Sequence, residues 1–170
     1  MKDIKSNGVK FLVISDIHDN LVNLEKCLKW GRGQSIKNAI CCGDLANSET
    51  LAYLAGKFEL VYLVKGNAEL YDEAEVKKYK NINYFGRFGI FEADGRTIGL
   101  CHEPIYIDKV LELKKCEMIF YGHTHKPWIE DRVGVTVANP GTLGGVFNKA
   151  SFAVYDSENG KLELKILELL

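Results

Sequence analysis

The polar side chains that could bind a metal follow apolar runs typical of β-strands. The chain has four histidines, and each of them stands at such a position, together with two aspartates and one asparagine. The seven residues are Asp16, His18, Asp44, Asn67, His102, His123 and His125. In open α/β sheets, ligands bind beyond the carboxyl ends of the strands. We therefore predict that five strand ends bring these side chains together at a metal site.

The residue types narrow the choice of metal. Imidazole, carboxylate and amide oxygen without thiolate favour Mn, Fe, Zn, Ni or Co over Cu(I), an iron–sulfur cluster or an all-oxygen calcium site. Seven candidate ligands exceed the four of a tetrahedral zinc, so two ions that share a carboxylate would use them better. Two divalent ions outweigh two aspartates in charge and would attract an anion such as phosphate. Such a pair, about 3.5–4 Å apart, can activate a water and hold phosphoryl oxygens.

Each motif taken alone has an ordinary structural explanation. An aspartate at a strand end, such as Asp16, often caps the next helix. Gly43-Asp44 and Gly66-Asn67 are common turn sequences, and a lone His102 is more often a hydrogen-bonded histidine of the core or its rim. The joint pattern, which uses every histidine of the chain, carries the prediction of a metal site.

Composition restricts the class of protein. The chain has 170 residues, a net charge of −1 and no basic block, so binding to long polynucleotides is not expected. No apolar stretch reaches the roughly 18 residues of a membrane span, and the first eight residues lack the pattern of a secretory signal. The five cysteines show no C-x-x-C spacing, so we interpret them as reduced structural residues. These features predict a cytoplasmic location.

The first half of the chain alternates predicted strands and helices. Apolar strands are predicted over 9–15, 38–42 and 59–65. Helices are predicted from 21 to a stop at Gly31 and Gly33, after an N-cap at Ser48, and through a charged stretch ending near Lys78. Short apolar strands separated by helices indicate a parallel sheet.

The second half of the chain has a different pattern, with a hairpin signal and a series of predicted strands. Asp94-Gly95 predicts a tight hairpin between strands 88–93 and 96–101. A helix over 107–115 and a strand over 118–121 follow. Further strands are predicted over 127–131, 133–138, 150–155 and 161–167. We expect one mixed α/β domain over residues 1–170, with two sheets packed face to face and helices outside.

The motifs in this order resemble the signature of the calcineurin-like metallophosphoesterases. The resemblance rests on Asp16-x-His18, Gly43-Asp44, Gly66-Asn67, His102 and Gly122-His123-x-His125, and it runs from about residue 9 to 155. Asn139-Pro140-Gly141-Thr142 is similar to the Asn-Pro-Gly-Ser segment of the small, single-domain, phosphodiesterase-like members. The resemblance implies a four-layer αββα sandwich of two mixed β-sheets flanked by helices, with a dinuclear centre.

The same resemblance implies a role for each ligand. Asp16, His18 and His125 would hold one metal, with manganese expected first and Ni, Fe, Zn or Co as alternatives. Asn67, His102 and His123 would hold the other, and Asp44 would bridge the two. Asn67 and His102 would contribute to catalysis through the water and phosphate at the metals.

The main departure from the family pattern is Ala68. Members with Gly-Asn-His-Asp or Gly-Asn-His-Glu have there a histidine thought to protonate the leaving oxygen or steady the phosphate. The small phosphodiesterase-like relatives often lack it too. Its absence removes an acid that typically contributes 10²–10⁴-fold, so we predict a preference for good leaving groups. Relatives also often have glycine at Asp19, and we interpret Glu69 as a hydrogen-bond partner near the site or a helix-start carboxylate rather than a ligand.

Three functions are weighed. The leading hypothesis is a metal-dependent phosphoesterase, in particular a phosphodiesterase, that acts on a small phosphate ester or nucleotide without a membrane partner; a homo-oligomer is compatible with it. The alternative is a protein-binding scaffold of the same fold, like the retromer scaffold subunit with its degraded site. A nuclease is the third, and the near-neutral charge argues against it.

Overall fold

The computed structural model describes residues 8–170, which form two β-sheets and their covering helices. The six-stranded sheet has the order β11-β10-β1-β2-β3-β4 and the five-stranded sheet the order β5-β6-β7-β9-β8. The first sheet consists of β1 (Lys10–Ile14), β2 (Asn38–Cys41), β3 (Leu60–Leu63), β4 (Ile82–Tyr84), β10 (Ser151–Asp156) and β11 (Lys161–Ile166). The second consists of β5 (Phe88–Ala93), β6 (Arg96–Cys101), β7 (Met118–Phe120), β8 (Trp128–Arg132) and β9 (Val135–Asn139).

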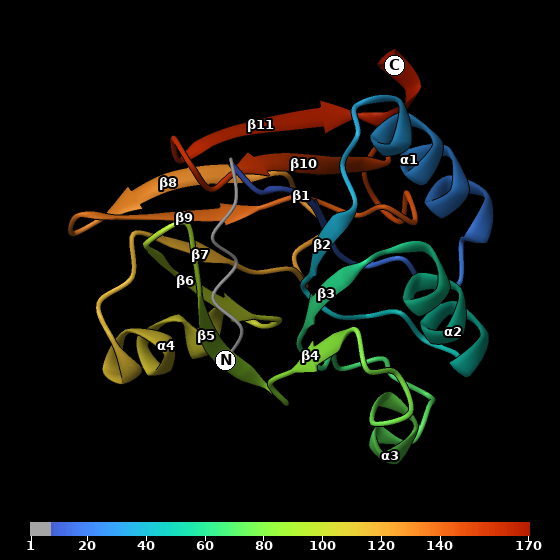
Figure 1. Cartoon of the computed structure of the whole chain (residues 1–170), viewed down its shortest axis with the longest axis horizontal. Coiled ribbons are helices and arrows are strands. Elements are labelled where there is room, and N and C mark those ends of the chain that lie inside the picture. The colour runs from blue at the N-terminus through green and yellow to red at the C-terminus, as the bar shows by residue number, and fades with distance from the viewer. Residues whose placement is uncertain (1–7) are drawn as a thin grey trace.

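Helices cover the outer faces of both sheets (Figure 1). The helices α1 (Leu21–Gly33) and α2 (Ser48–Lys57) pack on the six-stranded sheet, and α4 (Ile107–Leu113) packs on the five-stranded one. The short α3 (Glu73–Val76) and the 3-10 turns Pro104–Tyr106 and Leu167–Leu169 complete the order of elements. The predicted four-layer αββα sandwich of two mixed sheets is confirmed.

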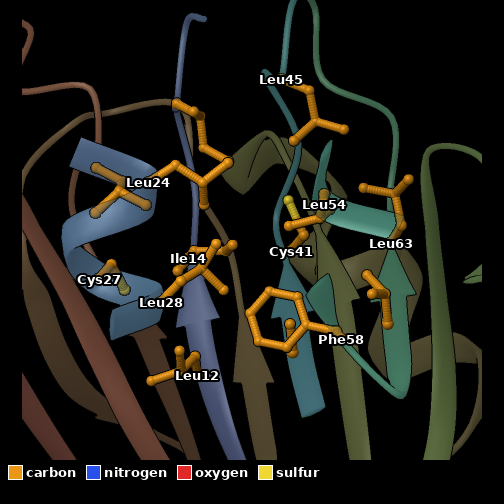
Figure 2. Packing of buried hydrophobic residues seen from close by; sticks show 14 of the residues in the cluster. Leu12, Ile14, Leu24, Cys27, Leu28, Cys41, Leu45, Leu54, Phe58 and Leu63 are labelled. Carbon is orange, nitrogen blue, oxygen red and sulfur yellow. The ribbon is translucent and has the colours of Figure 1, made fainter. Parts of the chain in front are cut away.

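The period-two alternation of β1 explains the layering. Phe11 and Val13 point into the core between the two sheets, whereas Leu12 and Ile14 point toward the helices. Figure 2 shows Leu12 and Ile14 beside residues of α1, including Leu28. All four strand side chains are fully buried. Complete burial of such a side chain stabilises the fold by about 1.5–3 kcal/mol, so both faces of this strand anchor the loop that follows it.

Parallel pairing brings the ends of the first strands to one edge. The β1 strand pairs in parallel with β2, and β2 pairs in parallel with β3. In the other sheet, β6 pairs in parallel with β7. The loops after these five strands therefore leave the sheets in register with their neighbours, as the sequence predicts.

Three details differ from the sequence prediction. Ser48 is the first residue of α2 rather than its N-cap, and the cap residue Asn47 makes no side-chain capping bond. The Asp19 carboxylate accepts hydrogen bonds from the Asn47 N–H at 2.9 Å and from the Thr50 hydroxyl at 2.6 Å instead. A carboxylate from another loop thus satisfies one backbone N–H at the start of this helix and binds a side chain of its first turn.

The other two differences concern the segment after β3. The charged helical stretch predicted to reach Lys78 is helical only over Glu73–Val76, within a capping box that begins at Asp72. The strand β4 was not predicted, because it has only three residues and its side chains are exposed or half-buried. It is ordered through parallel pairing with β3.

The five cysteines are all buried, and each is a free thiol within residues 8–170. Burial raises the pKa of Cys101 to about 12 and raises the pKa of Cys42 as well. These neutral thiols pack as small apolar groups. Among residues 8–170, no helix combines the length and apolar character that crossing a membrane requires.

Candidate metal centre

Four of the seven predicted side chains form the first half of the candidate site. One ligand atom each of Asp16, His18, Asp44 and His125 lies within 4.8 Å of the other three. His125 Nε2 lies 3.1 Å from Asp16 Oδ1 and 3.3 Å from His18 Nε2. His18 Nε2 lies 3.7 Å from Asp44 Oδ2. Loops after β1, β2 and β7 therefore meet around one point.

The remaining three side chains form the second half. The amide oxygen of Asn67 lies 2.9 Å from His102 Nε2 and 2.8 Å from His123 Nδ1. His102 Nε2 also lies 3.4 Å from Asp44 Oδ2. The Asp44 carboxylate thus stands between both halves, and all seven predicted residues share one site.

Backbone carbonyls orient two of the imidazoles. His102 Nδ1 lies 2.6 Å from the carbonyl oxygen of Cys42, and His125 Nδ1 lies 3.1 Å from that of Val146. Because a carbonyl oxygen only accepts, each Nδ1 must donate. In the neutral imidazole, Nε2 then carries the lone pair and points toward the site, which is how neighbouring groups prepare histidine for a metal.

The carboxylate of Asp16 is held by one oxygen and open at the other. Its Oδ2 accepts hydrogen bonds from the Ser15 hydroxyl at 2.6 Å and from the His123 N–H at 3.0 Å. Its Oδ1 is buried and accepts no hydrogen bond from residues 8–170. A buried carboxylate oxygen without a donor is costly, and a cation at this point would satisfy it. This orphaned oxygen and the donor set fit a divalent metal.

The backbone of the site is crowded and strained. A Cβ at Gly66 would lie 2.0 Å from Asp44 Oδ1, and a Cβ at Gly122 would lie 2.0 Å from Ser15 Oγ. Only glycine fits at these two positions. Five of the seven candidate ligands also adopt left-handed backbone angles, with φ between 47° and 68°: Asp16, His18, Asp44, His123 and His125. Such strain is concentrated at functional sites and persists only where surrounding structure enforces it.

The two carboxylates influence the imidazoles beside them. The Asp16 carboxylate, whose Oδ1 lies 3.8 Å from His18 Nε2, raises the pKa of His18, and the charge of Asp44 adds to this effect. Burial, the largest single influence, would lower the pKa of His102, but the contact with Asp44 and the charges of Asp44 and Asp16 together outweigh burial and raise the pKa. Burial would raise the pKa of Asp44, but the hydrogen bond with His102 lowers it. Without a cation, the carboxylates therefore favour the protonated form of these two imidazoles.

Glu69 connects two of the ligand loops. Its Oε1 accepts a hydrogen bond from the Gly66 N–H at 3.0 Å, and its Oε2 accepts from the Leu45 and Ala46 N–H groups at 3.0 and 3.1 Å. The Ala68 N–H donates to Asp44 Oδ1 at 2.8 Å. Glu69 thus supports the loops that carry Asp44 and Asn67, one of the two roles that the sequence left open for it.

A further supporting segment lies behind the histidine pair. Asn139 Nδ2 donates to the Gly122 carbonyl at 2.8 Å, and its Oδ1 accepts from the Gly141 N–H at 2.8 Å. Thr142 Oγ1 donates to the Asp16 carbonyl at 3.0 Å. This segment was singled out in the sequence only by its resemblance to a family motif. The carbonyl oxygens of Cys42 and Val146 were missed, because main-chain groups leave no trace in residue type.

Comparison with known proteins agrees with this geometry. Residues 9–160 match the family model of the calcineurin-like phosphoesterase superfamily domain. A phosphodiesterase of Methanocaldococcus jannaschii is 23% identical over 167 residues, which cover 94% of this chain and 100% of that protein.

Solved structures show the same fold. The structure of an archaeal phosphodiesterase superposes with a TM-score of 0.82 at 20% identity and covers 93% of this chain and 99% of its own. Vacuolar protein sorting 29 from Cryptosporidium parvum superposes with a TM-score of 0.68 at 21% identity and covers 95% and 97%. The match of the family model over nearly the whole chain shows that this protein belongs to the calcineurin-like phosphoesterase superfamily.

Proposed function

We propose that this protein is a phosphodiesterase that hydrolyses small phosphate esters with the help of two divalent metal ions. The observation that carries the proposal is the position of Asp44, whose Oδ2 lies 3.7 Å from His18 Nε2 and 3.4 Å from His102 Nε2. One carboxylate within reach of two separate ligand clusters favours two ions over one. The similarity to proteins named phosphodiesterases supports a phosphate diester as the substrate.

Each ion would have its own ligands. Asp16, His18 and His125 would hold the first ion, Asn67, His102 and His123 would hold the second, and Asp44 would contact both. Manganese is the first metal to test, with Ni, Fe, Zn and Co as alternatives, because the donor set contains imidazole and carboxylate without thiolate. When bound, the ions would supply Lewis acidity for attack of water on phosphorus and for the negative charge that develops there.

The residues of the chain prepare this chemistry in two ways. The carbonyl partners of His102 and His125 keep Nε2 free to bind, and Asp16 and Asp44 offset part of the positive charge. The hydroxyl of Ser15, beside Asp16, is buried and donates to the Asp16 carboxylate. We therefore expect water, rather than a side chain, to attack phosphorus, without a covalent phospho-enzyme.

The test compares Asp44→Asn with Asp131→Asn, an exposed aspartate of β8. Protein stripped with a chelator and reloaded with Mn²⁺ should hydrolyse an activated phosphodiester, and elemental analysis should find about two ions per chain. Asp44→Asn should lose turnover and at least one ion, whereas Asp131→Asn should retain both. Equal turnover after exhaustive metal removal would contradict the proposal.

A second candidate is a protein-binding scaffold with a weak metal site. Ala68, where many relatives have a catalytic histidine, and the fold similarity to vacuolar protein sorting 29 favour it. The Asp44→Asn variant separates the two functions. A scaffold would capture the same partners from a lysate with and without Asp44, and neither form would hydrolyse a phosphoester.

The location we propose is the cytoplasm, in keeping with five buried free thiols.

A further inference from the structure

Phe147 presents an aromatic side chain to solvent at the edge of the candidate metal centre. Its ring centroid lies 5.6 Å from that of His125, with 34° between the ring planes. Yet 92% of the residue is exposed. A phenylalanine whose purpose was to shield the histidine would lose far more surface on folding. Its contact with His125 therefore leaves most of the aromatic surface available to another molecule.

Two hydrogen bonds hold the backbone of Val146, the residue before Phe147. The carbonyl of Val146 accepts a hydrogen bond from His125 Nδ1, and the Val146 N–H donates a hydrogen bond to Thr142 Oγ1 at 3.4 Å. Phe147 itself has a φ of 63°. A bulky residue rarely adopts this left-handed conformation without a reason. The loop thus fixes an exposed aromatic residue next to a ligand of the metal centre.

We propose that Phe147 is a stacking surface for an aromatic group of the substrate, so that the substrate is an ester in which an aromatic ring, such as a nucleobase, lies close to the phosphate. This inference rests on the proposed function, which places a phosphate at the metals. A phosphate that lies against the ligand cluster carries its organic group over the adjacent rim, and Phe147 contributes an aromatic face to that rim. Base–aromatic stacking is tolerant of base identity, since every base has a π-face.

The test measures binding of two phosphates that differ only in the base. Manganese-loaded protein is titrated calorimetrically with adenosine 5′-monophosphate and with ribose 5-phosphate, which share the sugar phosphate. We expect the wild type to bind the nucleotide about 5- to 150-fold more tightly, the range that one stacked base contributes. Phe147→Leu should remove this preference and leave the affinity for ribose 5-phosphate unchanged. Phe147→Tyr should keep the preference.

The matched control is Val133→Ala. Val133 is also fully exposed and also has a left-handed φ of 49°, but it lies in the turn between β8 and β9. This variant should bind both phosphates like the wild type. Metal content is measured for every variant, because a loss of metal in Phe147→Leu would show that Phe147 only supports His125, and that result would overturn the inference.

Two failures are distinguishable. If the protein hydrolyses phosphodiesters but binds both phosphates equally, or if Phe147→Leu weakens both equally, the stacking role is wrong while the proposed function stands. If the metal-loaded protein binds neither phosphate and hydrolyses no ester, the proposed function and the stacking role fall together.

Discussion

Asp44 and His102 form a buried pair in which each partner favours the charged form of the other. Asp44 Oδ2 and His102 Nε2 are 3.4 Å apart, and both residues are almost completely buried. Burial opposes charge on each of them, but their hydrogen bond lowers the pKa of Asp44 and raises that of His102. The same two atoms face the position proposed for the second ion, so a proton and a cation compete for this place.

The pair predicts opposite pH dependence with and without metal. In metal-free protein, the stability from the raised pKa values of His18 and His102 is complete below the ordinary value of 6.5 and is lost as pH rises through their higher folded values. The contribution of Asp44, whose pKa is lowered, is present above its ordinary value of 3.8 and is lost only as pH falls through the folded value. Metal binding requires neutral imidazoles, so metal affinity should rise with pH.

Thermal unfolding measures both effects. From about pH 6 to about pH 8, the midpoint temperature of unfolding should fall in the presence of a chelator. The difference between the midpoint with saturating Mn²⁺ and the midpoint with chelator should increase over the same range. Parallel curves with and without metal would contradict a metal site at these imidazoles.

Replacing Glu69 should weaken metal binding without removing a ligand. Glu69→Gln places an amide NH₂ group where the carboxylate accepts from Gly66 or from Leu45 and Ala46. Loss of such a supporting group typically costs 10–100-fold in metal affinity or activity, and unpaired buried N–H groups cost about 1–3 kcal/mol of stability. Metal titration and denaturant unfolding measure the two effects. Glu112→Gln, at an exposed position of α4, is the control and should change neither.

Asp19 should contribute more to the stability of α2 than Ser48 does. Asp19→Ala removes the carboxylate that accepts from Asn47 and Thr50, and loss of a helix cap costs about 0.5–2 kcal/mol, typically about 1 kcal/mol. Ser48→Ala removes only an exposed hydrogen bond to Glu75 and should stay within about 0.5 kcal/mol of wild type. Chemical denaturation of both variants is the measurement. Equal losses would show that the helix start depends on Ser48 after all.

A histidine at position 68 should broaden the range of leaving groups. Ala68 is half-buried, and its N–H is bound to Asp44, so its side chain projects from a fixed point beside the site. Ala68→His would supply an acid for the leaving oxygen, and such an acid typically contributes 10²–10⁴-fold. We expect the gain for alkyl esters and little gain for nitrophenyl esters. Ala68→Gln, which is polar but cannot donate a proton as an acid, serves as the control, and an equal gain in both variants would refute the role.

The sequence predicted the layers because side-chain alternation is a property of single strands. Phe11 and Val13 point to one face of the sheet, and Leu12 and Ile14 point to the other. Because all four are apolar, the sequence already implies a sheet that is covered on both faces. The hairpin around Asp94-Gly95 follows from local turn preference, and its strands have the predicted bounds. The meeting of the seven candidate ligands follows from the rule that parallel strands end at one edge.

The remaining features depend on contacts between distant segments. Asp19 caps α2 across 28 residues of chain to Asn47, and local sequence gives no reason to prefer it to Ser48. The β4 strand has little apolar character of its own and is specified by pairing with β3. The exposed ring of Phe147 lies near His125 only because the loop between β9 and β10 returns to the histidine pair. Such relationships require the folded chain.

The carbonyl groups of Cys42 and Val146 have a consequence for how this protein can diverge. Main-chain oxygens are present whatever side chain a position bears, so exchanging Cys42 or Val146 for another residue leaves the acceptors for His102 and His125 in place. The orientation of these two imidazoles therefore depends on the course of the backbone and not on the residue types at positions 42 and 146. Sequence drift around the centre can therefore be extensive while the direction of its nitrogen lone pairs is preserved.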